Sequence, residues 1–254
     1  MTLKLALVMG LEYTGTRNYL PGCINDANAI KQLLLQNGYE EENIVMMTDN
    51  MKGDKYPTSA NILKQLRVLV RKANASKAKR VWISFSGHGG STRDLGTDES
   101  DGKDETIFAL DEKDILDDKL HKILRKVNKK TKVVGLFDSC HSGTVCDLSH
   151  TYSYRDNLTL DYKEDDVRRM RPKIVTISGC IDTQNSFSID NGTRWVGALT
   201  QAFLKLVMKS GKSIKYPRIG RFLTKNVTLG LDLPQRPVIS SSRRLVDRRP
   251  IILL

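Results

Sequence analysis

The chain has 254 residues, of which 39% are hydrophobic and 28% charged, and its formal net charge is +12. This length allows one sizeable α/β domain or two small ones, and because no Pro/Ser-rich linker or internal repeat divides it, we expect a single domain over residues 1–254. The apolar runs are too short to cross a bilayer, and the N-terminus lacks the basic flank and cleavage site of a signal peptide. Because the four cysteines do not resemble a disulfide framework either, these features exclude a membrane protein and favour a cytoplasmic one.

The charge is distributed unevenly. Residues 94 to 118 hold eleven Asp or Glu against two Lys, a local net charge of −9 that leaves +21 for the rest of the chain. A basic excess of this kind is typical of a solubilising surface with weak attraction to nucleic acid. No nucleic-acid-binding motif with interleaved aromatic residues accompanies it, so we do not expect nucleic-acid binding as the main role.

Short apolar runs alternate with helical patterns along the chain. The runs predict strands at 3–10, 43–48, 80–86, 132–138, 173–179 and near 236–240. Helices are predicted at 26–35, at 59–73 with Thr58 as the N-cap, at 117–127 and at 195–208. This alternation predicts an α/β fold, a mainly parallel central sheet with helices on both faces. The polar stretch 149–172 lacks clear periodicity and is expected to be a long surface loop.

Two predicted strands end in chemically capable side chains. Strand 80–86 runs into Ser86-Gly87-His88-Gly89-Gly90, and strand 132–138 runs into Asp138-Ser139-Cys140-His141-Ser142-Gly143. Because parallel strands end at the same edge of a sheet, His88 and Cys140 should meet there as base and nucleophile. The sequence therefore predicts a cysteine hydrolase, with the amides of Gly89 and Cys140 as donors to an oxyanion.

Less specific interpretations of these residues stay open. Cys140 alone is as consistent with a small buried hydrophobe, and His88 with a buried, hydrogen-bonded histidine. His141 is a rival base, although neighbours along an extended segment point to opposite faces. The spacing of Cys140, His141, Cys146 and His150 does not match zinc knuckles. The acidic block 98–105 has oxygen ligands that suit Ca²⁺ but lacks the ligand spacing of an EF-hand, so a solvated acidic loop is the simpler interpretation.

Seven blocks of the chain resemble the signature blocks of the metacaspases, which are caspase-like cysteine peptidases. They lie in family order between about residue 4 and residue 242, and caspases proper differ by a Gln-Ala-Cys nucleophile block that is absent here. No Pro/Gln/Tyr-rich extension precedes the first strand, so the form without a prodomain is expected. The blocks are 22–27, 86–90, 101–105, 117–118, 138–143, 178–186 and 197–203.

The resemblance implies a role for each matching residue. It implies a caspase-like fold with a large-subunit-like part (1–148), the loop 149–172 and a small-subunit-like part (173–254). It implies a monomer that acts on proteins or peptides with basic residues and needs no cofactor for the chemistry itself, but is activated by weakly bound Ca²⁺. The implied site residues are His88 and Cys140 as the catalytic dyad, Cys23, Asp26, Ser86 and Asp138 as an Arg/Lys-specific pocket, and Asp104, Asp117, Asp118 and Asp147 as calcium ligands.

Two hypotheses for the activity follow. The first is a cysteine endopeptidase that cleaves after Arg or Lys and cuts its own loop 149–172, most readily after Arg168, Arg169 or Arg171, since basic residues in a surface loop are candidate substrates for such an enzyme. The second is a catalytically inactive caspase-like scaffold that binds a protein partner.

Overall fold

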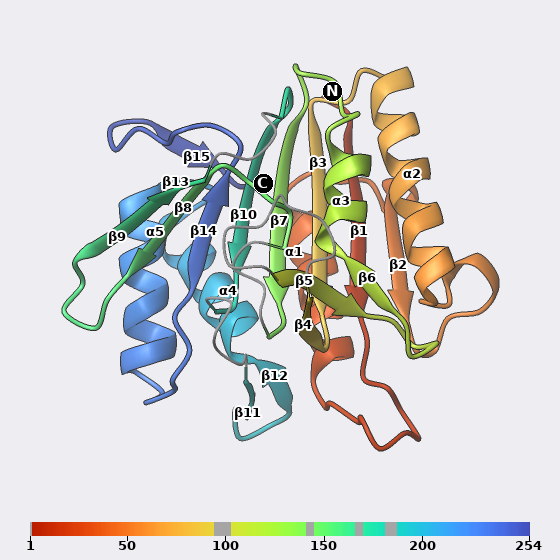
Figure 1. Cartoon of the computed structure of the whole chain (residues 1–254), viewed down its shortest axis with the longest axis horizontal. Coiled ribbons are helices and arrows are strands. Elements are labelled where there is room, and N and C mark those ends of the chain that lie inside the picture. The colour runs from red at the N-terminus through yellow and green to blue at the C-terminus, as the bar shows by residue number, and fades with distance from the viewer. Residues whose placement is uncertain (1, 94–102, 141–144, 166–169, 181–186) are drawn as a thin grey trace.

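The computed structural model describes residues 2–93, 103–140, 145–165, 170–180 and 187–254. Within these residues the centre is an eight-stranded sheet of order β2-β1-β3-β7-β10-β14-β8-β9 (Figure 1). The first five strands in this order are parallel, and β14, β8 and β9 are antiparallel to their neighbours. The strands are β1 (Lys4–Gly10), β2 (Ile44–Thr48), β3 (Arg80–Ser86), β7 (Lys132–Asp138), β8 (His150–Tyr154), β9 (Leu160–Glu164), β10 (Lys173–Ser178) and β14 (Val238–Ser241).

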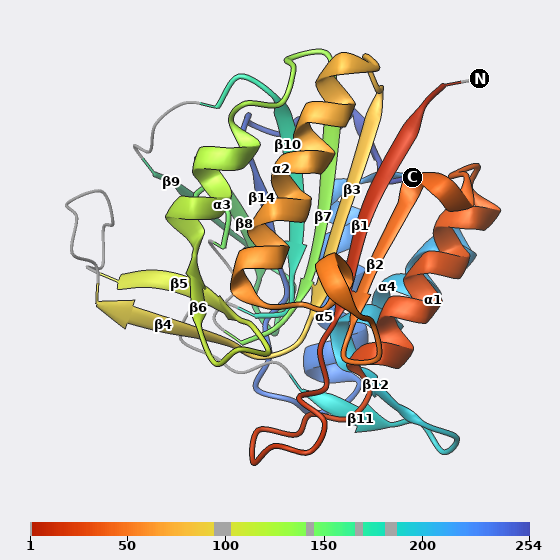
Figure 2. The same ribbon diagram turned by 90° about the vertical axis from the view of Figure 1, so that its right-hand side faces the viewer.

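Helices cover both faces of this sheet, as the alternation of strands and helices predicts. Along β1, Leu5, Leu7 and Met9 join one hydrophobic core, and Ala6 and Val8 join the other. Figure 2 shows α2 and α3 on the first face and α1 and α4 on the second. The helices are α1 (Cys23–Gln36), α2 (Ser59–Ala75), α3 (Asp117–Leu124), α4 (Ala198–Ser210) and α5 (Tyr216–Thr224).

Three small antiparallel sheets flank the large one within the described residues. The first consists of β4 (Gly89–Arg93), β5 (Lys103–Phe108) and β6 (Asp114–Leu116), the second of β11 (Ser188–Asp190) and β12 (Trp195–Gly197), and the third of β13 (Ser213–Lys215) and β15 (Pro250–Ile252). The remaining elements are the short helical turns η1 (Glu41–Asn43), η2 (Gly53–Lys55) and η3 (Lys225–Leu229).

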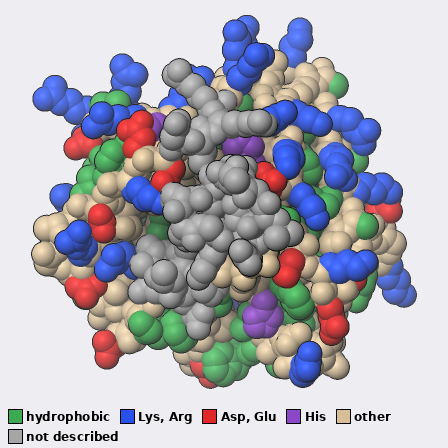
Figure 3. All heavy atoms as spheres, in the orientation of Figure 1, with side chains coloured by type: hydrophobic (Ala, Val, Ile, Leu, Met, Phe, Trp, Pro, Cys, Tyr) green, Lys and Arg blue, Asp and Glu red, His purple; other side chains and the backbone are tan. Residues whose placement is uncertain are grey.

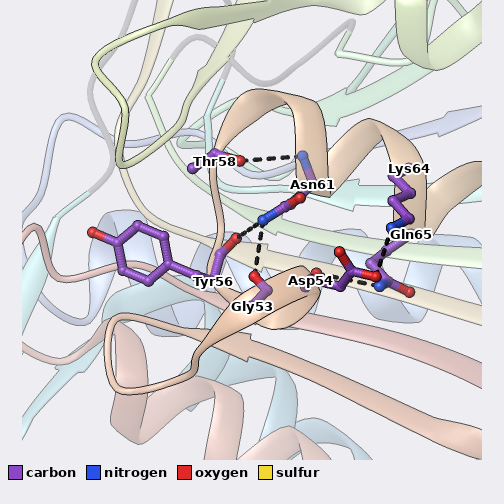
Figure 4. Close-up of polar contacts among 7 residues, drawn as sticks. All are labelled: Gly53, Asp54, Tyr56, Thr58, Asn61, Lys64 and Gln65. Carbon is purple, nitrogen blue, oxygen red and sulfur yellow. Dashed lines mark hydrogen bonds and ion pairs between the residues drawn. The ribbon is translucent and has the colours of Figure 1, made fainter.

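Helix α2 begins where the sequence predicts. The Thr58 hydroxyl accepts a hydrogen bond from the amide of Asn61 at 3.2 Å and so satisfies one of the otherwise unpaired N–H groups of the first turn. The side-chain amide of Asn61 in turn donates to the carbonyls of Gly53 and Tyr56, at 3.0 and 2.8 Å, which ties the preceding turn η2 to the helix (Figure 4).

The prediction of a long loop at 149–172 is wrong in its first half. Strands β8 and β9 form a hairpin there, and β8 pairs with β14, so the hairpin extends the central sheet. Tyr152 and Tyr154 are buried on β8, whereas β9 is an edge strand of mixed polar composition. An edge strand needs no apolar face, which is why hydrophobic periodicity does not reveal it.

The other predicted elements are observed with small shifts at their ends. The helix predicted at 195–208 is α4 and begins three residues later, because residues 195–197 form β12. The helix predicted at 117–127 ends at Leu124. All four cysteines are free thiols, and among the described residues no helix is long and apolar enough to span a membrane.

Candidate active site

His88 and Cys140 lie side by side at the carboxyl edge of the central sheet. The last residues of β3 and β7, Ser86 and Asp138, are paired in register. His88 and Cys140 each follow two residues after the end of these strands. The backbones remain close, because a Cβ atom added at Gly89 would lie 2.2 Å from the carbonyl oxygen of Cys140. Both side chains line a pocket of about 330 Å³.

The ring of His88 is oriented by the loop that follows β1. Its Nε2 lies 2.8 Å from the carbonyl oxygen of Asn18. A carbonyl can only accept a hydrogen bond, so Nε2 carries the proton in the neutral ring and Nδ1 is the nitrogen that can take one up. The arrangement gives His88 the tautomer that a general base needs.

Tyr13 holds the backbone of His88 and was not singled out from the sequence. Its hydroxyl accepts a hydrogen bond from the His88 amide at 2.9 Å and donates one to the Phe108 carbonyl at 2.7 Å. The two rings also pack against each other, with centroids 4.7 Å apart. Its φ of 54° places Tyr13 in the left-handed region, unusual for a bulky residue and typical of functional sites. Its position directly after the carboxyl end of a predicted strand is the signal that could have identified it.

Two buried carboxylates lie beside the pocket: Asp138 lines it, and Asp26 lies behind the lining residue Gly197. Asp26 comes from α1 and Asp138 from the end of β7, and their exposed fractions are 3% and 5%. Ser86 Oγ donates to Asp26 at 2.7 Å, and the Gly197 amide donates to both Asp26 oxygens at 3.0 Å. Thr200 donates to Asp138 from its amide at 2.8 Å and from its hydroxyl at 2.9 Å. Hydrogen bonds from four groups therefore fix both carboxylates.

Gly197 is the residue that lets the two carboxylates approach each other. A Cβ atom there would lie 2.1 Å from Asp138 Oδ2 and 2.6 Å from Asp26 Oδ2, so a larger residue would displace both. Burial, and then the charge of Asp138, raise the pKa of Asp26 well above its usual value. A cation bound next to the pair would offset both the burial and the repulsion between the carboxylates, so the pair favours a cationic partner.

Cys23 lines the same pocket but differs from Cys140 in its surroundings. Burial raises the pKa of the Cys23 thiol well above its usual value, which keeps it protonated and unreactive. Cys140 is partly exposed, as a nucleophile must be. Of the two cysteines in the pocket, Cys140 is the one that can react.

The four predicted calcium ligands gather loosely around the N-terminal end of α3. Asp117 is buried, and its oxygens accept hydrogen bonds from the amides of Glu105 and Asp118 at 2.8 and 2.7 Å. Asp118 forms an ion pair with Lys122, and Asp147 lies 3.9 Å from His121. Carboxylates are suitable calcium donors, but among the described residues no group of three or more Asp, Glu, His or Cys is arranged to hold a metal ion. The described part of the chain is thus not a preformed calcium site.

The predicted processing residues are only partly described. Arg168 and Arg169 lie outside the described residues. Arg171 is exposed, and its carbonyl accepts a hydrogen bond from Arg243 at 3.0 Å.

Comparison with known proteins relates the chain to one family. The family model described as the metacaspase peptidase C14 domain matches residues 4–149. The chain is 44% identical to Metacaspase-1 of Schizosaccharomyces pombe over 156 residues, which are 59% of this chain and 36% of that protein. It is 36% identical to Metacaspase-1 of Candida albicans over 222 residues, which are 84% of this chain and 47% of that protein. The chain therefore spans less than half the length of these curated relatives.

Solved structures share the fold at low sequence identity. A crystal structure of a protein from Geobacter sulfurreducens matches with a TM-score of 0.64 and 24% identity, over 94% of this chain and 93% of that one. A structure of pro-sf-caspase-1 matches with a TM-score of 0.54 and 13% identity, over 98% and 90% of the two chains. These likenesses confirm the caspase-like fold. Because the family model covers more than half of its length, the chain belongs to the metacaspase family of C14 cysteine peptidases.

Proposed function

We propose that this protein is a cysteine endopeptidase that cleaves peptide bonds after Arg or Lys. The observation that carries the proposal is that His88 and Cys140 line one pocket with Asp138, and that a second buried carboxylate, Asp26, lies next to Asp138. A nucleophile with an adjacent base is the minimum for acyl transfer, and paired carboxylates match a guanidinium or ammonium group.

The proposed chemistry uses Cys140 as the nucleophile and His88 as the base. His88 Nδ1 takes the thiol proton of Cys140, and the sulfur attacks the carbonyl carbon of the scissile bond. The amides of Gly89 and Cys140 are the proposed donors to the oxyanion that forms. The protonated His88 then gives its proton to the leaving amine. Water hydrolyses the thioester, with His88 accepting a proton from the water, and the free thiol is restored.

The proposed preference for Arg or Lys is supported by the two buried carboxylates. Asp26 and Asp138 are already held by hydrogen bonds, so the side chain of the residue before the scissile bond does not have to order them. An incoming Arg or Lys lowers the cost of keeping both carboxylates ionised in a buried site. An incoming Asp adds a third negative charge and should be rejected.

A panel of fluorogenic peptides with Arg, Lys or Asp before the reporter group tests this function. We expect turnover of the Arg and Lys substrates only, and loss of all turnover in Cys140→Ala and His88→Ala. Residual activity above a few per cent in Cys140→Ala would identify another nucleophile. Binding of a partner protein by a wild-type chain that turns over no peptide would instead support the inactive scaffold.

Calcium activation is a further proposal, with Asp104, Asp117, Asp118 and Asp147 as the residues that would hold the ion. It is supported by the donor chemistry and by the shared location of these carboxylates at the N-terminal end of α3. Calorimetric titration with CaCl₂, and MgCl₂ as the control, should show selective calcium binding that Asp104→Asn weakens. Equal binding of both ions, or no binding at millimolar calcium, would contradict the proposal.

Self-cleavage in 149–172, around Arg168, Arg169 or Arg171, is proposed because basic residues there match the proposed specificity. Incubation with millimolar Ca²⁺ should produce a new N-terminus after one of these residues in the wild-type chain and none in Cys140→Ala. A chain that stays intact while it turns over the Arg substrate would contradict self-cleavage without affecting the proposed activity.

A further inference from the structure

Cationic residues lie in register at the amino-terminal ends of four strands of the central sheet, opposite to the active site. The parallel pairings align Lys4 of β1 with Arg80 of β3, Arg80 with Lys132 of β7, and Lys132 with Lys173 of β10. Paired residues on adjacent strands project from the same face, about 5 Å apart. Because β7 has seven residues from Lys132 to Asp138, the row of cations lies about 20 Å from the strand ends that carry the active site.

Such a row is electrostatically unfavourable unless something neutralises it. Like charges directly opposite each other destabilise a sheet. Burial, and then the charges of Lys212 and Arg80, lower the pKa of Lys4, in keeping with mutual repulsion. Among the described residues, no acidic side chain forms an ion pair with Lys4, Arg80, Lys132 or Lys173.

A pocket of about 390 Å³ lies beside the end of this row, and residues of β14 and β15 contribute to its lining. Lys132 and Lys173 contribute to its wall, together with Arg243, Arg244 and Arg249 from the segment between β14 and β15. None of the described residues that line it is acidic. The rest of its wall includes aliphatic side chains, and the volume is that of a small-molecule site.

The segment that carries the arginines is held in place. The Arg243 guanidinium donates to the carbonyl of Arg171 at 3.0 Å, and the Arg244 guanidinium lies 5.6 Å from the centre of the Tyr162 ring. The amide of Leu245 donates to the hydroxyl of Tyr152 at 2.8 Å. The cations are therefore presented by an ordered wall, and a ligand would not have to order a loose loop.

We propose that this pocket binds a small organic polyphosphate, such as a nucleoside triphosphate. Arginine forks match phosphate oxygens bidentately, the two lysines add point charges, and the aliphatic wall accommodates the ring of the ligand. A compact pocket favours a small ligand over an extended acidic peptide.

Overall positive charge is a rival explanation, because Lys and Arg also gather over α2 (Figure 3). The experiment therefore compares two variants that each lose two arginines. Arg243→Gln/Arg249→Gln removes charge from the pocket, and Arg67→Gln/Arg71→Gln removes it from a second basic pocket beside α2. Both are made in a Cys140→Ala background, so the result does not depend on the proposed peptidase activity.

Binding of ATP, tripolyphosphate, adenosine and hexaglutamate is measured by calorimetry at about 150 mM salt, where long-range attraction is screened. We expect ATP to bind most tightly, followed by tripolyphosphate, with adenosine weakest. Arg243→Gln/Arg249→Gln should weaken ATP binding at least about tenfold, because two charge-assisted contacts are lost. Arg67→Gln/Arg71→Gln should leave it within about twofold. Equal losses in both variants, or tighter binding of hexaglutamate than of ATP, would overturn the proposal.

The charge row gives a second readout that needs no ligand. Lys132→Gln should raise the melting temperature of the free protein by about 1–3 °C, because Lys132 lies between Arg80 and Lys173. The same variant should reduce the further rise produced by ATP. A lower melting temperature without ligand would mean that the row is already neutralised, which contradicts the proposed site.

Discussion

Two groups of carboxylates in this molecule differ in how they are held. Asp26 and Asp138 are fixed by donors from Ser86, Gly197 and Thr200. Both lie against Gly197, and Asp138 lines the pocket. The calcium candidates around α3 are instead engaged separately: Asp117 by backbone amides, and Asp118 by a lysine one turn further on. The pocket is thus organised before substrate arrives, whereas a calcium ion would have to draw its ligands together. Because preorganised charged groups contribute more to binding, removing one from the pocket should reduce activity more than removing one of the calcium candidates.

The largest effect is expected from Asp26→Asn. It keeps the shape of the side chain but removes a carboxyl group that a bound Arg side chain would hold in its ionised form, so kcat/KM for the Arg substrate should fall about thirtyfold or more. Asp54→Asn, an exposed acid paired with Lys64, serves as the control and should change the activity less than about twofold. A similar kcat/KM in Asp26→Asn and Asp54→Asn would show that the pocket does not select by charge.

Gly197→Ala tests the close approach of the two carboxylates. The added Cβ would lie within 2.6 Å of both Asp26 and Asp138, so their oxygens must move. We expect kcat/KM for the Arg substrate to fall about tenfold and the free energy of unfolding to drop by about 1–3 kcal/mol, as for other overpacked sites. Kinetics and urea unfolding that match the wild type would refute this role of Gly197.

Tyr13→Phe tests whether the hydroxyl of Tyr13 is needed to position His88. The change removes the hydroxyl between the His88 amide and the Phe108 carbonyl but keeps the ring that packs on His88. We expect kcat to fall several-fold with KM nearly unchanged, and the free energy of unfolding to fall by about 1 kcal/mol, because two partly buried polar groups lose their partner. Tyr39→Phe, another buried tyrosine, is the matched control. A loss of stability with unchanged kcat would assign Tyr13 a purely structural role.

The pH dependence of stability should separate the wild type from Asp26→Asn. The pKa of Asp26 is raised in the folded state, so the folded state binds this proton more tightly than the unfolded chain, whose pKa is about 3.9. The protonated Asp26 carboxyl therefore stabilises the fold fully below about pH 4. This stabilisation is lost as the pH rises through the folded-state pKa, at up to about 1.4 kcal/mol per pH unit. Asp26→Asn should lack this decline in urea unfolding above pH 4. Parallel curves for the two proteins would contradict the raised pKa.

The smallest effect is expected from Asp118→Asn without calcium. An exposed ion pair one helical turn apart contributes about 0.3–0.5 kcal/mol, so the melting temperature should hardly change. If calcium draws these carboxylates together, the difference between variant and wild type should grow when calcium is added. A large loss of stability without calcium would mean that this group is as preorganised as the pocket.

The sequence predicts the parts of this structure that depend on buried strands. The apolar runs locate β3 and β7 within a residue, and parallel pairing then brings His88 and Cys140 together. Asp26, Asp138 and Gly197 are far apart in the chain, so no local pattern predicts that they meet. The family resemblance places Asp26 and Asp138 in one pocket, and the structure adds their contact with Gly197. The hairpin β8–β9 and helix α5 were missed, although the alternating Tyr152 and Tyr154 followed by a turn at Asp156-Asn157 is a strand signal. The position of Tyr13 after a predicted strand makes it a candidate site residue, but its hydrogen bonds join separate loops, and no local sequence pattern encodes those partners.

Covalent labelling tests the central claim most directly, since it examines the nucleophile and the pocket in one reaction. The protein is incubated with two peptidyl electrophiles that differ only in carrying Arg or Asp before the reactive group, and the modified residue is located by peptide mass spectrometry. We predict fast labelling of Cys140 by the Arg reagent, little by the Asp reagent, and a marked slowing with the Arg reagent in Asp26→Asn. Labelling of Cys23, or equal labelling of Cys140 by both reagents, would contradict the account.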